Sequence, residues 1–169
     1  MGTPEQDEVF LAVIEQNKGI IYKIANSFKK DEDDKKDLMQ EIVLQLWRSF
    51  SSYDDRSKFS TWMYRVALNV AIASYRKEKK KNELITALPE SMIAFVNDED
   101  INYKEHELTL LHQFINELKE LDRALILLYL EEKSGKEIAE ILGLSETNIR
   151  TKINRIKEQL KQRFSTNKL

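Results

Sequence analysis

The sequence of 169 residues contains no cysteine, which excludes a disulfide framework and any metal site built from thiolates. A reducing cytoplasm is the simplest setting for such a chain. No apolar run approaches the roughly 20 residues that a helix needs to cross a bilayer. The start of the chain is acidic and polar, unlike a secretory signal. We therefore expect a cytoplasmic protein without membrane insertion.

The residues of common catalytic sites are also missing. The chain has no glycine-rich loop to cradle a phosphate, and His106 and His112 lack any plausible set of accompanying ligands. The adjacent Asp33 and Asp34 fit a solvated connector better than a metal site or an acid–base pair. We expect no enzymatic activity, no metal, no cofactor and no small-molecule substrate, which leaves binding surfaces as the basis of function.

The formal net charge of −2 would by itself argue against a nucleic-acid binder. The charges, however, are segregated along the chain. Acids cluster at 31–34 and 98–100, whereas bases cluster at 76–81 and 150–163. Such segregation favours separate surfaces for separate partners.

Only four glycines and two prolines, with apolar residues at helical spacing almost throughout, predict an all-α fold. Thr3 and Pro4 mark the start of the first helix. The stretch 82–107 lacks this spacing and is rich in acids. We predict two small helical domains, 1–85 and 108–169, joined by an acidic linker at 86–107. The helices after the first are expected at about 36–50, 59–81, 108–118, 122–132, 136–142 and from about 146 onward.

The last two helices have the pattern of a helix-turn-helix. Gly143, Leu144 and Ser145 form a tight turn, and the Ser145 hydroxyl can cap the helix that follows. Ser134 and Glu137 form a capping box at the start of the shorter helix. Apolar residues at helical spacing in the longer helix predict its core face: Ile149, Ile153, Ile156 and Leu160. Its other surface carries donors and cations that suit a major groove and its phosphates: Thr147, Arg150, Thr151, Asn154, Arg155 and Lys157. The alternative is an ordinary helical hairpin whose polar face is simply solvated.

The second helix has one apolar residue too many for a single buried face. Its predicted buried stripe is Met39, Ile42, Val43, Leu46, Trp47 and Phe50. The opposite face carries Asp37, Gln40, Glu41, Leu44 and Arg48. Leu44 is therefore predicted to be exposed among polar residues. Such a leucine is either a scattered surface residue or part of a protein-docking surface, and the pattern alone leaves both open.

The third helix carries a basic strip. Arg65, Asn69 and Arg76 share one narrow face, with Trp62 at its edge and a run of lysines beyond its end. Cations that meet phosphates and aromatic rings that meet unstacked bases suit single-stranded or distorted DNA. The alternative for Trp62 and Tyr64, each taken singly, is that the side chain is an ordinary core residue.

With these features, the chain resembles the extracytoplasmic-function (ECF) group of bacterial RNA polymerase sigma factors. In the first half the resemblance rests on the motifs DLMQE at 37–41, LW at 46–47, FSTWM at 59–63, ALNVA at 67–71 and YRK at 75–77. In the second half it rests on KEIAEILG at 136–143, Ser145 and IRTKI at 149–153. Both halves match in the family's order, with an acidic linker between them.

The resemblance implies a role for each surface, with core RNA polymerase and promoter DNA as partners and an anti-sigma factor as a further expected one. The polymerase clamp helices would bind Asp37, Gln40, Glu41 and Leu44. The third helix and the loop before it would melt the minus-ten element and hold a flipped non-template base, using Tyr53, Asp54, Arg56, Lys58, Trp62, Arg65, Asn69, Arg76, Lys77 and Lys80. The helix-turn-helix would read the minus-thirty-five duplex with Lys136, Thr147, Arg150, Thr151, Asn154, Arg155 and Lys157. The linker would run through the polymerase toward the RNA exit path.

One departure from the family is Ala73, four residues after Asn69, where members often carry an aspartate. The structural or DNA-proximal polar contact of that aspartate therefore does not carry over from the family to this chain. The main rival class is a two-domain transcriptional regulator that binds operators by its helix-turn-helix alone. Such a regulator has no need for the aromatic and basic third helix.

Overall fold

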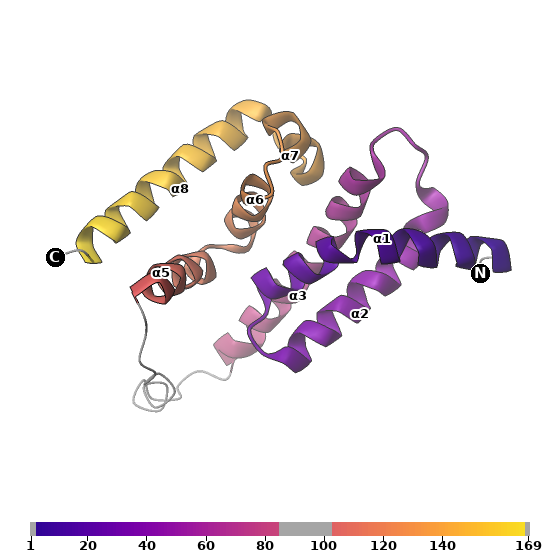
Figure 1. Ribbon diagram of the computed structural model, residues 1–169, viewed down its shortest axis with the longest axis horizontal. Helices are drawn as coiled ribbons and strands as arrows, with labels where there is room; N and C mark the ends of the chain where they lie inside the picture. The colour runs from indigo at the N-terminus through magenta and orange to yellow at the C-terminus, as the bar shows by residue number, and fades with distance from the viewer. Residues whose placement is uncertain (1–2, 85–102, 168–169) are drawn as a thin grey trace.

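The computed structural model describes residues 3–84 and 103–167, and all of its regular elements are helices. The first domain contains α1 (Pro4–Phe28), α2 (Glu32–Ser49), a 3₁₀ turn η1 (Phe50–Ser52) and α3 (Phe59–Leu84). The second contains α5 (Tyr103–Glu117), α6 (Glu120–Leu130), α7 (Gly135–Leu142) and α8 (Glu146–Asn167). The predicted all-α fold of two helical domains is confirmed (Figure 1). No helix in these ranges is both long and apolar enough to cross a membrane.

The predicted helix starts are confirmed by their caps. The Thr3 hydroxyl accepts a hydrogen bond from the Gln6 amide, and the Gln6 side chain accepts one from the Thr3 amide, which completes a capping box. Ser134 and Glu137 form the same reciprocal pair, with both bonds at 3.1 Å. α7 ends at Gly143, whose φ of 69° lies in the left-handed region that glycine adopts without steric cost.

The boundaries of two predicted elements were wrong. The stretch 31–34, expected as an acidic connector, forms the cap and first turn of α2, which begins at Glu32 rather than near Lys36. Three carboxylates in that turn suit the positive end of the helix dipole, although helix propensity alone would not have placed them there. α5 begins at Tyr103, inside the predicted linker 86–107. The rest of that linker, with the 98–100 acids, lies outside the described residues.

The core of the first domain is formed by all three long helices. Its largest fully buried side chains are Ile24, Leu38, Ile42, Leu46, Met63 and Leu68. Leu38 was missing from the predicted stripe of α2, whereas the predicted Met39, Val43, Trp47 and Phe50 are partly buried against this core. Trp47 and Phe50 lie edge-on to Phe10, at centroid distances of 5.1 and 5.3 Å.

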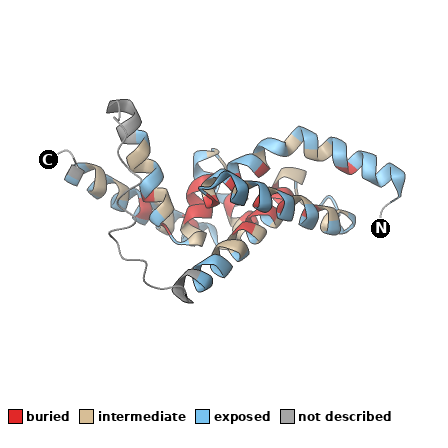
Figure 2. Cartoon of the chain, turned by 90° about the horizontal axis from the view of Figure 1, so that it is seen from below, coloured by how far each residue is buried: buried red, intermediate tan, exposed pale blue. Residues whose placement is uncertain are grey.

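The two domains are packed against each other and share a continuous hydrophobic core. Figure 1 shows α6 and α7 lying beside α3, and in Figure 2 buried residues gather where the domains meet. Arg123 of α6 is at the centre of this contact and is only 4 % exposed. Its guanidinium lies 4.8 Å from the ring centroid of Tyr75 and 5.6 Å from that of Phe28. A buried cation thus joins the second domain to α1 and α3.

Candidate nucleic-acid interface

An open cavity of about 540 Å³ lies between the loop after η1 and the first turns of α3. Its lining residues come from the loop, from α3 and, in one case, from α7: Ser52, Tyr53, Asp54, Arg56, Ser57, Trp62, Arg65, Val66, Asn69 and Glu140. The cavity thus brings together the predicted loop residues Tyr53, Asp54 and Arg56, but not Lys58, with the first part of the predicted basic strip. Its size and its mixture of aromatic, amide and charged groups suit a nucleobase.

The loop is held in shape by its own hydrogen bonds. The Tyr53 hydroxyl donates to the Ser57 carbonyl at 2.7 Å, and the Asp54 carboxylate accepts from the Arg56 amide at 3.2 Å. The Arg56 side chain returns to the same carboxylate at 3.0 Å. Asp55 takes a left-handed φ of 61°, a conformation that aspartate tolerates better than most residues. The loop therefore presents a defined set of polar groups to the cavity.

Aromatic contacts attach the loop to α3. Trp62 packs with its ring centroid 5.3 Å from that of Tyr53 and 5.4 Å from that of Phe59. Trp62 is only 8 % exposed and Tyr64 is also buried, so the core interpretation of both residues is confirmed. Tyr53 is the more accessible of the two rings that line the cavity.

The predicted basic strip of α3 is exposed, and two of its cations meet the second domain. Lys77 and Lys80 also lie on the exposed part of this helix. The Arg65 guanidinium donates to the Glu140 backbone carbonyl at 2.9 Å, and Arg76 pairs with Glu120 at 2.8 Å. The Arg76 hydrogen bond is the main reason that the pKa of Glu120 is lowered. From the loop, Lys58 pairs with Glu137 at 3.5 Å.

Sequence reasoning missed the residues on the other side of these contacts: Glu120, Glu137 and Glu140. The Arg65–Glu140 bond spans 75 residues along the chain, and the Arg76–Glu120 bond spans 44. No local pattern links such distant positions. The one available signal was composition, because α6 and α7 carry acidic residues that could pair with basic residues elsewhere in the chain.

The helix-turn-helix is formed as predicted. The Ser145 hydroxyl accepts from the Asn148 amide at 3.1 Å, and Ile149 and Ile156 are buried while Ile153 and Leu160 are partly buried. The predicted DNA-facing residues are exposed: Lys136, Thr147, Arg150, Thr151, Asn154, Arg155 and Lys157. Two of the cations among them already have partners on α6.

Arg155 and Lys157 both contact α6. Arg155 lies 3.2 Å from a carboxylate oxygen of Asp122, and the Lys157 ammonium lies 4.6 Å from the ring centroid of Tyr129. Lys152 also approaches Asp122, at 4.0 Å. These contacts hold the middle of the recognition helix against α6 and orient its cations.

The exposed face of α2 borders an apolar groove. Asp37, Gln40 and Glu41 are exposed, and Leu44 is 47 % exposed. Gln40 and Leu44 line an open groove of about 780 Å³ between α1 and α2, whose other walls are mostly apolar. Leu44 is therefore continuous with a larger apolar surface, and this favours a docking role over that of an isolated surface leucine.

No group of acidic or histidine side chains that could hold a metal ion occurs in the part of the chain covered by the structure. A helix-turn-helix in one domain and a loop cavity with a basic helix in the other define a DNA-binding protein with two separate DNA contacts.

Comparisons with known proteins identify the family. The Sigma-70 region 2 model matches residues 13–81, and the Sigma-70, region 4 model matches residues 108–160. The ECF RNA polymerase sigma factor SigW of Bacillus subtilis is 28% identical over 167 residues, covering 93% of this chain and 89% of the relative. SigM of Bacillus subtilis is 29% identical, covering 86% and 88%. The chain belongs to the ECF group of sigma factors.

Solved structures agree on the fold. CnrH, determined in complex with the cytosolic domain of CnrY, superposes with a TM-score of 0.68 at 20% identity and covers 95% of this chain and 90% of its own. RpoE from Bartonella quintana, determined with the anti-sigma factor NepR, gives a TM-score of 0.64 at 19% identity and covers 96% and 98%. The protein is thus a sigma factor that binds core RNA polymerase and directs promoter-specific initiation. A regulator that uses its helix-turn-helix alone would leave the region 2 match unexplained.

Proposed function

We propose that the loop cavity holds a flipped base of the minus-ten element and that the α3 strip binds the same strand. The observation that carries this proposal is the cavity itself, which places Tyr53, Arg65 and Asn69 around one open space with room for a nucleobase. The recognition helix α8 would read the minus-thirty-five duplex, and Asp37, Gln40, Glu41 and Leu44 would dock on polymerase. The first domain would be 1–85 and the second would begin with α5 at Tyr103, and the linker between them would lie inside the polymerase.

The same proposal includes the setting in which the protein acts. It would work in the cytoplasm and catalyse no bond-making step of its own. An anti-sigma factor is a proposed further partner, supported by the two structural neighbours, which were both solved as complexes, one of them explicitly with an anti-sigma factor.

The energetics favour a role for bound polymerase. Melting a promoter costs on the order of 1.4 kcal/mol for each stacking step lost. Extrusion of one base into a pocket and neutralisation of phosphates by Arg65, Arg76 and the lysines offset part of this cost. A free protein of net charge −2 is a poor DNA binder by itself. Docking on polymerase supplies the missing positive surface.

Exchange of the loop tests where minus-ten specificity resides. Replacing Ser51–Ser60 by the corresponding loop of SigW should transfer that relative's minus-ten preference, because the loop supplies most polar groups of the cavity. The minus-thirty-five preference should stay unchanged and serves as the internal control. The measurement is in vitro transcription from a library randomised in the minus-ten element. If the chimaera keeps the parent's preferred bases, specificity resides instead in Arg65, Asn69 and Arg76.

Substitution of Arg155 tests the recognition helix. Arg155→Ala should weaken holoenzyme binding to the cognate minus-thirty-five duplex by about 1–3 kcal/mol if the guanidinium reads a base pair. If Arg155 serves only to pair with Asp122 and does not touch DNA, its loss would alter stability and leave sequence preference unchanged. Lys161→Ala, at an exposed position later in α8, is the matched control. Footprinting on cognate and mutated duplexes distinguishes base readout from a phosphate contact, which would weaken all sequences alike.

A further inference from the structure

We infer that Asp122 of α6 is a positioning residue for promoter selectivity, which holds the Arg155 guanidinium in the orientation that reads a minus-thirty-five base pair. Asp122 itself would not touch DNA and would act through Arg155 alone. This inference rests on the proposed function of α8. It goes beyond that function because it places a determinant of base preference outside the recognition helix.

The contact between the two side chains leaves Arg155 able to bind a second partner. Nη2 of Arg155 donates to both carboxylate oxygens of Asp122, at 3.2 and 3.4 Å. A guanidinium carries five N–H donors, and a bidentate base contact needs only two of them. The Arg155 side chain is 53 % exposed, whereas that of Asp122 is only 17 % exposed. The carboxylate is thus largely covered, while the guanidinium stays accessible to DNA.

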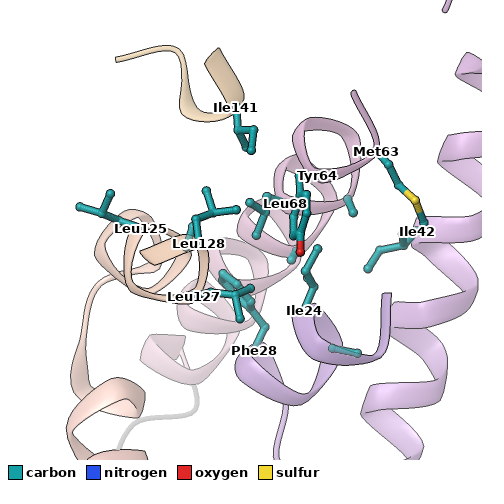
Figure 3. Packing of buried hydrophobic residues seen from close by; sticks show 14 of the residues in the cluster. Ile24, Phe28, Ile42, Met63, Tyr64, Leu68, Leu125, Leu127, Leu128 and Ile141 are labelled. Carbon is teal, nitrogen blue, oxygen red and sulfur yellow. The ribbon is translucent and has the colours of Figure 1, made fainter. Parts of the chain in front are cut away.

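The Asp122 carboxylate stands on a rigid support. Leu125 and Leu128 of the same helix are fully buried, within the hydrophobic cluster drawn in Figure 3. Asp122 lies in the first turn of α6, where the positive end of the helix dipole stabilises a negative charge. A long arginine side chain loses much rotamer freedom when it binds, and a fixed partner removes part of that freedom beforehand. Asp122 therefore preorganises Arg155 for contact with a base.

α6 holds α8 on both flanks of its outward face. Arg155 and Lys157 are about 200° apart around the helix axis, so they lie on opposite flanks. The Lys157 ammonium lies 4.6 Å from the ring centroid of Tyr129, which follows Asp122 by about two turns of α6. Lys152, on the flank of Arg155, lies 4.0 Å from Asp122. These contacts fix the rotation of the recognition helix as well as the direction of Arg155.

A carboxylate beside a DNA-facing cation has an electrostatic cost. It repels phosphates and offsets part of the positive charge of Arg155 and Lys152, so it lowers the attraction of α8 for DNA of any sequence. A positioning role therefore predicts effects of opposite sign when Asp122 is lost. Binding to non-preferred sequences should be unchanged or tighter, whereas discrimination between sequences should fall. Loss of a residue that only stabilises the domain would weaken binding to all sequences alike.

Substitution of Asp122 tests this inference in holoenzyme reconstituted from the full chain and core polymerase. The probe is a promoter-fragment library randomised in the minus-thirty-five element, and sequencing of bound and unbound fractions gives relative affinities. D122A should reduce discrimination at least about threefold at the base pair whose preference Arg155→Ala abolishes. Affinity for the least preferred sequences should not fall, and its salt dependence should steepen because Arg155 and Lys152 become available to phosphates.

The matched control is E117A. It removes the same charge and also breaks an ion pair with an arginine of α8, Arg163, which lies about two turns beyond Arg155 and outside the proposed DNA contacts. Base preference in E117A should match the parent. D122E keeps the carboxylate and should recover most of the discrimination. The double variant D122A/R155A should show the preferences of Arg155→Ala alone, because two residues that act through one contact are not additive.

The outcomes separate this inference from the proposed function. If Arg155→Ala loses preference at one base pair and D122A does not, the inference is wrong and the role of α8 stands. Uniformly weaker binding of D122A to all sequences would show that Asp122 only stabilises the domain. A further change of preference in D122A/R155A would show that Asp122 acts independently of Arg155, which also overturns the inference. If Arg155→Ala changes no preference, Arg155 reads no base, and its proposed function fails together with the inference.

Discussion

Replacement of Glu41 and Leu44 by arginine is expected to reduce capture of core polymerase by a factor of ten or more. Both residues are exposed on α2, and Leu44 borders the apolar groove against α1. Two arginines would place positive charge on a face that otherwise offers a carboxylate and an apolar side chain. A tenfold loss corresponds to about 1.4 kcal/mol of binding free energy. A pull-down titration with the purified polymerase core measures this effect.

The fold should survive this double substitution. Neither side chain belongs to the buried set of α2, which consists of Leu38, Ile42 and Leu46. The matched control is L108R/E158R, which makes the same change of charge at exposed positions of the second domain. Normal helicity with unchanged polymerase affinity in E41R/L44R would exclude this face as the docking surface.

The helix-turn-helix could be predicted from sequence because its determinants are local. Ser134, Glu137, Gly143 and Ser145 lie within a few residues of the groups that they cap, and each predicted bond is present. Apolar spacing likewise predicted the exposure of Leu44, because one helix turn fixes which side chains share a face. Such features depend on neighbours in the chain and not on the tertiary arrangement.

The packing of the two domains against each other could not be predicted from such local features. The contact between Arg65 and Glu140, for example, depends on how two amphipathic units meet. Leu38 was left out of the predicted core because the predicted stripe of α2 assumed one packing partner. In the fold, α2 contacts both α1 and α3. The start of α2 was misplaced because a run of acids resembles a solvated loop, whereas the helix dipole stabilises it in a first turn.

Arg123 is the clearest case of a residue whose role depends on the tertiary structure. In the sequence it is one more basic residue on a predicted helix. In the fold it donates to the backbone carbonyls of Ile115, Asn116 and Leu118 at the end of α5. Its opposite side faces the rings of Phe28 and Tyr75 in the first domain. Burial lowers the pKa of the guanidinium, but arginine stays protonated at any ordinary pH.

Arg123→Ala is therefore expected to destabilise the protein by about 2–4 kcal/mol, since it removes a desolvated cation–π contact and leaves helix-end carbonyls without their donor. For a chain of this size the melting temperature should fall by roughly 5–10 °C. Arg123→Lys keeps the charge over the rings but loses the planar fork, and Arg123→Met keeps only the volume. Both should recover a minority of the loss, whereas Arg150→Ala on the exposed face of α8 should have little effect.

The same substitution should also open the domains, because Arg123 contacts both of them. Energy transfer between dyes on cysteines introduced at Glu15 and Gln159, exposed positions in α1 and α8, reports their separation. In Arg123→Ala the transfer should decrease well below the melting temperature, while Arg150→Ala should match the parent. Full stability in Arg123→Met would mean that the guanidinium contributes volume alone. Unchanged transfer in a destabilised Arg123→Ala would mean that its bonds to α5, and not its contact with Phe28 and Tyr75, account for the loss.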